Sequence, residues 1–171
     1  MAGAPPASPS DLRVAEQVRA EQVRTLYRQS TPVLLANVVN AIIISAVLWS
    51  HASHVRLLAW TACMTAMALA RVELRRRYWS RERAAVEHAR WGLGFTLGSL
   101  CAGCLWGYAG FALMPDALPQ QVLVLFVVGG MAAAAAGTIS CFMPAYYAYL
   151  LPSLTPAIAR LARKASVEGQ S

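Results

Sequence analysis

Long apolar segments separated by short polar or basic ones make up most of this chain. After the mostly polar residues 1–30, this pattern predicts five membrane-spanning helices. They cover residues 32–50, 55–72, 91–114, 120–137 and 144–161. An α-helix needs about 20 apolar residues to cross the hydrocarbon layer of a bilayer. We therefore predict an all-α integral membrane bundle of about five helices, with four or six crossings as the alternatives.

The segment before the first crossing is predicted in two parts. Residues 1–8 are small and proline-rich, which is typical of disorder. Ser8, Pro9 and Asp11 then form the pattern of a helix start, in which Ser8 is the N-cap and Asp11 completes a capping box. Residues 9–30 form an amphipathic helix that either lies on the cytoplasmic membrane face or is a solvated lead-in. The transmembrane domain is predicted over residues 31–165, with a tail at 166–171.

Composition agrees with a membrane protein. Hydrophobic residues make up 57% of the 171 residues, charged residues only 13%, and the mean hydropathy is +0.45. No Asp, Glu, Lys, Arg or His occurs between Asp116 and Arg160, as two crossings require. The formal net charge of +7 comes from arginines that flank apolar segments, so we expect no nucleic-acid partner.

The arginines also predict the orientation. They are concentrated in residues 1–30 and 71–90, whereas the turns at 51–54 and 115–119 contain none. The positive-inside rule places the N-terminus and the 71–90 connector in the cytoplasm. Five crossings would leave the basic residues 160–164 outside. The connector residues expected to set the topology and to contact anionic lipid headgroups are Arg75, Arg76, Arg77, Arg81 and Arg83.

Two asparagines provide the most polar face of the first predicted crossing. Asn37 and Asn40 lie three residues apart, so both face the same side of the helix. An amide in hydrocarbon is costly unless it is paired. Thr61 and Thr65 on the second crossing are the expected partners. This face is either a ligand-sensing pocket or a packing contact between helices.

Small residues recur on the third and fourth predicted crossings. They let helix backbones approach closely in a membrane, where no hydrophobic force drives helix association. We expect them to pack helices within the chain or to form a dimer interface. The positions are Gly94, Gly98, Gly103, Gly107, Gly129 and Gly130.

Two short motifs offer metal or redox chemistry. Cys101 and Cys104 form a CxxC in the middle of an apolar run, without the helix N-terminus that activates a redox cysteine. His51 and His54 form an HxxH pair, and neither pair supplies a full set of metal ligands. We expect the cysteines to be packing residues and the histidines to lie at the interface, with metal or redox sensing as the alternative.

The motifs of common enzymes are not found in the sequence. It contains no glycine-rich phosphate loop, nucleophile elbow or HExxH. We expect no charged residue deep inside a crossing, where coupled transporters usually hold one. The chain is therefore predicted to bind, sense or anchor, without a cofactor or catalytic residues. A structural anchor is the alternative to sensing, and a small transporter component is less favoured.

Several segments resemble the N-terminal membrane regions of bacterial diguanylate cyclases (GGDEF type), their EAL-containing relatives and hybrid sensor histidine kinases. The similarity lies in LYRQS at 26–30 followed by PVLLANVVNA, in the arginines at 75–77, in GSLCAGCLWGYAGFALMP at 98–115 and in GGMAAAAAGTISCFMPAYYAYLLPSLTP at 129–156. The resemblance implies a MASE-like input domain, which usually has six helices followed by a cytoplasmic effector. We expect this sequence to lack the sixth helix and the effector, and to act through self-association or a separate effector.

Overall fold

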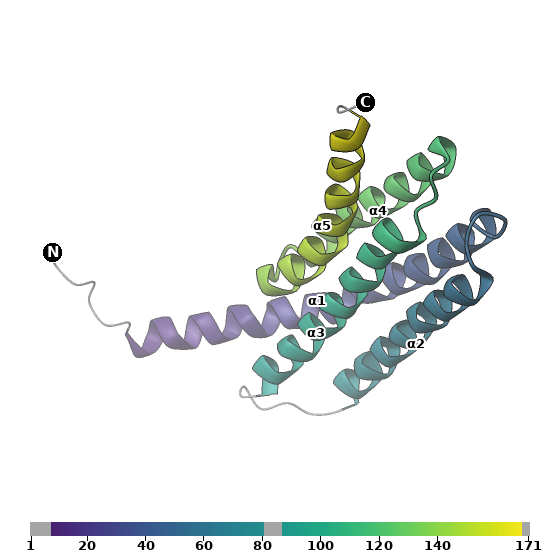
Figure 1. Ribbon diagram of the computed structural model, residues 1–171. Coiled ribbons are helices and arrows are strands. Elements are labelled where there is room, and N and C mark those ends of the chain that lie inside the picture. The colour runs from purple at the N-terminus through teal and green to yellow at the C-terminus, as the bar shows by residue number, and fades with distance from the viewer. Residues whose placement is uncertain (1–7, 81–86, 169–171) are drawn as a thin grey trace, which may run out of the picture.

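The computed structural model describes residues 8–80 and 87–168, and its regular structure there is entirely helical (Figure 1). This confirms the predicted all-α bundle. A short π-helical segment, η1 (Ala109–Leu113), continues the third helix. The helices are α1 (Pro9–Val47), α2 (His54–Trp79), α3 (Glu87–Tyr108), α4 (Leu118–Ile139) and α5 (Met143–Glu168).

Four of the described helices are long and apolar enough to cross a membrane. These segments are Arg13–Val47, His54–Trp79, Arg90–Leu113 and Leu118–Ile139. Large apolar side chains cover the outside of the bundle, and Phe126 and Val55 are 78% and 77% exposed. An apolar outer surface suits hydrocarbon, because lipid surrounds the bundle where water would surround a soluble one. The architecture is that of a multi-pass membrane protein.

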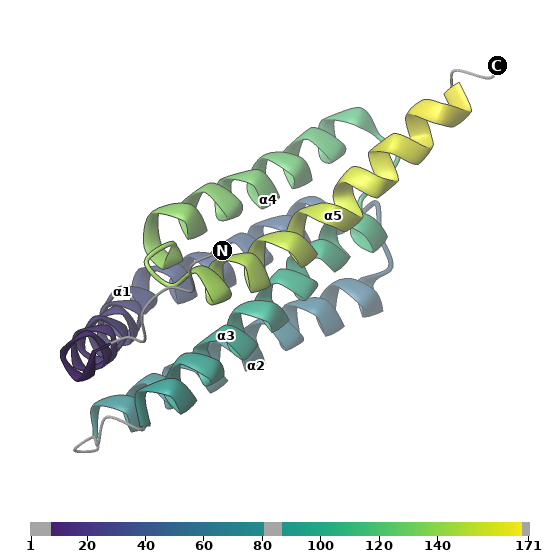
Figure 2. The ribbon, with the colours of Figure 1, turned by 90° about the vertical axis from the view of Figure 1, so that its left-hand side faces the viewer.

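The helices alternate in direction. The α1–α2 turn and the α3–α4 turn lie together at one end, here called the hairpin end (residues 48–53 and 114–117). The end of α2, the start of α3 and the α4–α5 turn lie at the opposite, N-terminal end. α5 runs back toward the hairpin end, and its last turns extend beyond the α3–α4 turn (Figure 2).

One continuous helix, α1, replaces the two that the sequence predicted. It is 39 residues long and passes through Pro32 without a break. Its buried positions recur every three or four residues, so a single stripe holds the second half of the amphipathic segment against the bundle. The first turns extend beyond the other helices (Figure 1). The buried positions are Val23, Leu26, Tyr27, Ser30, Leu34, Asn37, Ala41, Ile44 and Leu48.

The predicted start of this helix is confirmed. The Ser8 hydroxyl accepts a hydrogen bond from the Asp11 backbone N–H at 3.3 Å, and the Asp11 carboxylate accepts one from the Ser8 N–H at 3.0 Å. These reciprocal bonds satisfy two donors that a helix N-terminus otherwise leaves open. The predicted disorder of residues 1–8 falls outside the described residues, apart from Ser8.

α2 continues past residue 72, where the sequence predicted its end. Residues 73–79 remain helical, and Glu73 pairs with Arg77 at 2.8 Å on the exposed face. The first part of the expected connector, which includes Arg75, Arg76 and Arg77, is therefore the last two turns of a helix. Arg81 and Arg83 lie outside the described residues.

α3 packs closely on α5 through Gly103 and Gly107, which form a GxxxG motif. A Cβ on Gly103 would clash with the Tyr149 carbonyl, and one on Gly107 with the Pro152 carbonyl. The α5 prolines therefore lie against a glycine surface, at a distance that no larger residue permits.

The other predicted packing glycines lie in looser surroundings. A Cβ on Gly94 would lie 3.5 Å from the Leu74 side chain, and one on Gly98 would lie 3.3 Å from Arg71. Gly129 and Gly130 have nothing within 4 Å of such a Cβ. The packing expected within the chain is not made at these two positions, because α4 turns that face outward.

Candidate functional site

One arginine, Arg71, lies between the helices of the bundle with its side chain partly buried. The sequence places it at the boundary between the second predicted crossing, 55–72, and the connector, 71–90. It falls in helical register with the buried residues of α2, a spacing visible in the sequence. Those residues are Leu57, Trp60, Met64, Ala68 and Tyr78.

Aromatic rings surround the Arg71 side chain. Its guanidinium carbon lies 4.5 Å from the centroid of the Phe95 ring on α3, in a cation–π contact. The Phe95 ring meets the Tyr27 ring edge-on, with centroids 5.5 Å apart. Tyr27 in turn stacks on Tyr78 at 4.0 Å and donates a 3.1 Å hydrogen bond to the Trp91 carbonyl. This aromatic cluster joins α1, α2 and α3 at the N-terminal end of the bundle.

No carboxylate pairs with Arg71 among the described residues. A buried charge is costly unless an opposite charge or several hydrogen bonds compensate it. The ion pairs of the described part of the chain are Glu21–Arg24, Glu73–Arg77 and Asp116–Arg160.

Arg71 borders a small cavity at the centre of the bundle. About 20 Å³ is open to the centre of a water-sized sphere, which is enough for about one water molecule. Ser99 and Tyr149 line this space, with only 1% and 4% of their surface exposed. Both side-chain oxygens are buried without a hydrogen-bond partner in the described structure. Unsatisfied groups of this kind are rare in proteins and call for a ligand, a water or an ion.

Asn37 also lines the cavity, and both ends of its amide are bonded. Its Nδ2 donates to the Val33 carbonyl at 2.8 Å, and its Oδ1 accepts from Trp106 Nε1 at 2.6 Å. Trp106 is fully buried and packs edge-on against Trp60, with ring centroids 5.6 Å apart. Trp60 donates to the Leu105 carbonyl at 2.8 Å. Both tryptophans are therefore anchors of the core.

The predicted pairing of the asparagines with the threonines is not formed. Asn40 Nδ2 lies 3.2 Å from Met131 Sδ on α4. Thr61 shares a 2.6 Å hydrogen bond with Ser45, and Thr65 donates to the Thr61 carbonyl at 2.9 Å. The reason is the rotation of α1, which turns its asparagines toward α3 and α4 and leaves Ser45 facing α2.

The CxxC motif lies on the outside of the bundle. Cys101 and Cys104 are both exposed free cysteines on α3. Neither packs in the core, which differs from the expectation that they are packing residues. Within residues 8–80 and 87–168, no three His, Cys, Asp or Glu side chains gather as a metal site requires.

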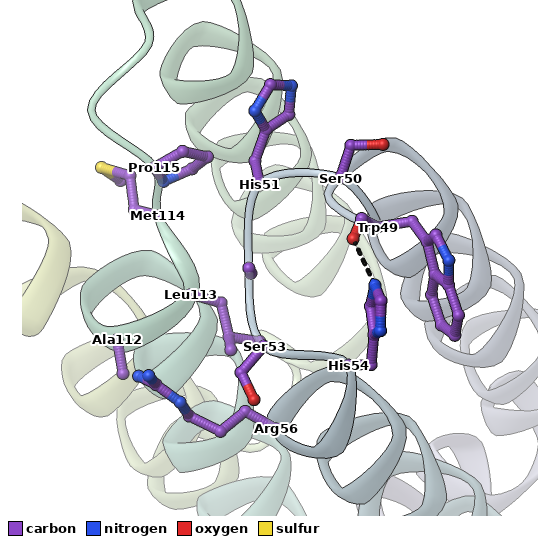
Figure 3. A pocket seen from close by; sticks show the side chains of 11 residues that line it. Trp49, Ser50, His51, Ser53, His54, Arg56, Ala112, Leu113, Met114 and Pro115 are labelled. Carbon is purple, nitrogen blue, oxygen red and sulfur yellow. Dashed lines mark hydrogen bonds between the residues drawn. The ribbon is translucent and has the colours of Figure 1, made fainter.

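The two histidines border an open pocket of about 620 Å³ at the hairpin end (Figure 3). They point to different partners. His51 Nε2 lies 3.0 Å from Gln120 Nε2, whereas His54 Nε2 lies 2.9 Å from the Trp49 carbonyl and its ring stacks on Trp49 at 4.3 Å. Arg56 is the charged residue of this pocket. The pair therefore shares no ligand in this arrangement.

The chain matches no protein-family model, no curated protein and no solved structure. The resemblance to MASE-like membrane regions consequently depends on the sequence segments alone and stays a prediction. Among the features described, the cluster of the partly buried Arg71 and the buried Ser99 and Tyr149 is the strongest candidate site. A charged residue inside a membrane bundle is expensive and usually has a function.

Proposed function

We propose that the chain is a membrane-embedded sensory input module of a bacterial signal-transduction system, of the cyclic-di-GMP or two-component type, with no catalytic activity of its own. The observation that supports it is the charge of Arg71 beside a cavity lined by unpaired hydroxyls. A charged ligand that enters or leaves such a site adds or removes a charge beside Arg71. That change can shift the packing of the helices around it.

α1 offers the route by which such a shift leaves the site. Ser30 and Asn37 line the cavity from this helix, and Tyr27, one turn earlier, belongs to the aromatic cluster. The helix then continues without a break to Pro9. A movement at the cavity is therefore carried to the exposed, arginine-bearing turns, where a cytoplasmic effector or a second copy would respond.

In this proposal the chain crosses the inner membrane with its N-terminus in the cytoplasm. Arg75, Arg76 and Arg77 lie at the N-terminal end of the bundle, where they would contact anionic lipid headgroups. α5 forms a fifth crossing that ends outside. Its direction supports this, since Arg160 donates to the Phe111 carbonyl and lies 3.6 Å from the Asp116 carboxylate at the hairpin end.

The sensory role is tested by signalling output in cells. Asn37→Leu and Arg71→Gln are compared with wild type and with a deletion, and Leu58→Ala, at a 56% exposed site, is the lipid-facing control. Cyclic-di-GMP content and transcript profiles are measured after insertion and abundance have been checked. We expect both cavity variants to change the output and the control to leave it unchanged. Inserted, stable cavity variants that leave every output at the wild-type level would reject the role.

A structural anchor that self-associates is the second candidate. The open face of α4 favours it, because Gly129 and Gly130 are exposed and a Cβ added at either would meet nothing within 4 Å in the described structure. An anchor predicts the opposite sensitivity. Substitutions in the cavity would be tolerated, while Gly129→Leu would abolish cross-linking between copies in the membrane.

A further inference from the structure

We infer that the cluster of the partly buried Arg71 and the buried Ser99 and Tyr149 binds one small inorganic anion, with chloride as the physiological example. The inference names the ligand of the proposed sensing site. It rests on the proposed function only for what the binding event does in the cell, since the site itself is defined by its charge, its hydroxyls and its size.

The charge of the site calls for an anion. Arg71 has five N–H donors and no acceptor, and its charge has no carboxylate partner in the described structure. On α2 the nearest acidic residue along the helix is Glu73, which is exposed and pairs with Arg77. The acidic residues of α1 are exposed and precede its buried stripe. A bound anion would supply the missing compensation.

The hydroxyls complete a set of donors. Ser99 on α3 and Tyr149 on α5 reach the same space as Arg71 on α2, and each has a buried oxygen without a partner. A hydroxyl can donate its proton to an anion, and hydrogen bonds to charged groups are stronger than neutral ones. One N–H of the Asn37 amide donates to Val33 and its oxygen accepts from Trp106, so this side chain lines the site with one further N–H donor.

The size of the cavity selects the ligand. About 20 Å³ for the centre of a water-sized sphere accommodates a water molecule or a monatomic halide. A phosphate, a lipid headgroup or a carboxylate metabolite does not fit. Gln29, which is exposed, and Thr138 line the cavity at its N-terminal end. We therefore place the entry of the anion on that side.

Halide binding to the purified full-length chain tests the inference. The protein is reconstituted in lipid nanodiscs, and radioactive chloride is measured by equilibrium dialysis at constant ionic strength, with gluconate as the replacing anion. We expect saturable binding of one chloride per chain, displaced by bromide. Arg71→Gln should weaken binding by about tenfold or more, and Ser99→Ala or Tyr149→Phe by about threefold each, as the loss of one hydrogen bond predicts. The matched control is Arg76→Gln, which removes an exposed arginine of the same helix and should leave binding unchanged.

Folded wild-type protein without saturable halide binding would overturn the inference, since the cavity would then hold water only. Equal weakening by Arg76→Gln would also overturn it, because the effect would be one of surface charge. If Arg71→Gln does not fold, the two hydroxyl variants decide, as each removes a single oxygen.

The inference and the sensory role fail separately. Intact chloride binding with unchanged cellular output in Asn37→Leu rejects the sensory role alone. A changed output without halide binding rejects the anion site alone.

Discussion

Asn37 and Trp106 make the shortest polar contact between side chains of α1 and α3, at 2.6 Å. Both residues are almost fully buried, so no water can take the place of either partner in this hydrogen bond. Removing one partner leaves the other unsatisfied, which costs more than the hydrogen bond contributes. At the scale of single residues, the order of the core depends on such pairs.

Trp106→Phe keeps a ring in the core but removes the donor to Asn37. We expect a loss of about 1–3 kcal/mol in the free energy of unfolding, because the Asn37 oxygen stays buried without a partner. Denaturation of the reconstituted protein measures the loss. Trp49→Phe, at a 44% exposed position, is the control. Equal stability of the two variants would contradict the assigned role of the pair.

The first turn of α1 should respond to acid. Hydrogen bonds from the Ser8 hydroxyl and the Ser8 backbone N–H hold the pKa of Asp11 below its ordinary value of 3.8. A lowered pKa in the folded state stabilises the turn above pH 3.8, and the contribution is lost as the pH falls through the folded-state pKa. The protection of the Ser8 and Asp11 amides against hydrogen exchange, relative to their intrinsic exchange rates at each pH, should therefore fall in acid. In Asp11→Asn this pH dependence should disappear.

At the scale of elements, the contact between α3 and α5 is set by backbone proximity. Gly103 and Gly107 lie directly under the carbonyls of Tyr149 and Pro152. This arrangement also explains why prolines are tolerated in α5, since the glycine surface accommodates their rings. The π-helical segment that follows α3 presents the Phe111 carbonyl to Arg160, which ties the far end of α5 to the hairpin end.

Gly107→Ala should force α3 and α5 apart. The added methyl has no room against the Pro152 carbonyl, so we expect a destabilisation of about 1–3 kcal/mol, typical of overpacking. Gly129→Ala is the control, because its methyl meets open space and alanine is the better helix former. Thermal unfolding in detergent compares the two. A Gly107→Ala variant as stable as the control would show that the helices do not approach as closely as described.

In α1, a local sequence pattern predicted the wrong extent of a helix. Pro32 and the change from polar to apolar residues predicted a boundary, yet the helix passes through both. The buried stripe from Val23 to Leu48 holds it together, and it was readable as one continuous spacing. Pro32 removes one N–H from the helix, the donor to the Arg28 carbonyl, and the packing of the buried stripe on both sides of it outweighs this loss.

At the scale of the whole molecule, the alternating helices place the two charged ends apart. The arginines of α1 and the end of α2 lie at the N-terminal end, whereas Arg56, Arg160 and Arg163 lie at the hairpin end. The contact of Arg163 with the Phe111 ring, at 5.0 Å to the centroid, keeps α5 beside α3 there. This arrangement predicts on which side of the membrane the end of α5 lies.

A reporter fused after Ser171 should give a periplasmic signal. α5 starts beside the N-terminal end and finishes past the α3–α4 turn, so its two ends lie on opposite sides if the N-terminus is cytoplasmic (Figure 2). Reporters at Met1 and in the turn at residues 51–53 provide the cytoplasmic and periplasmic references. A cytoplasmic signal after Ser171 would contradict the fifth crossing and leave four.

The amino-acid sequence determined the helical class, the approximate spans and the sorting of charge, because length and hydropathy are local properties and the bilayer demands helices of a given length. Only the tertiary structure decided which faces meet. It placed Arg71 beside the central cavity, paired Asn37 with Trp106 and left Gly129 outside. The physical reason is that each face depends on the rotation of its helix against partners distant in the chain, and no local pattern specifies that rotation.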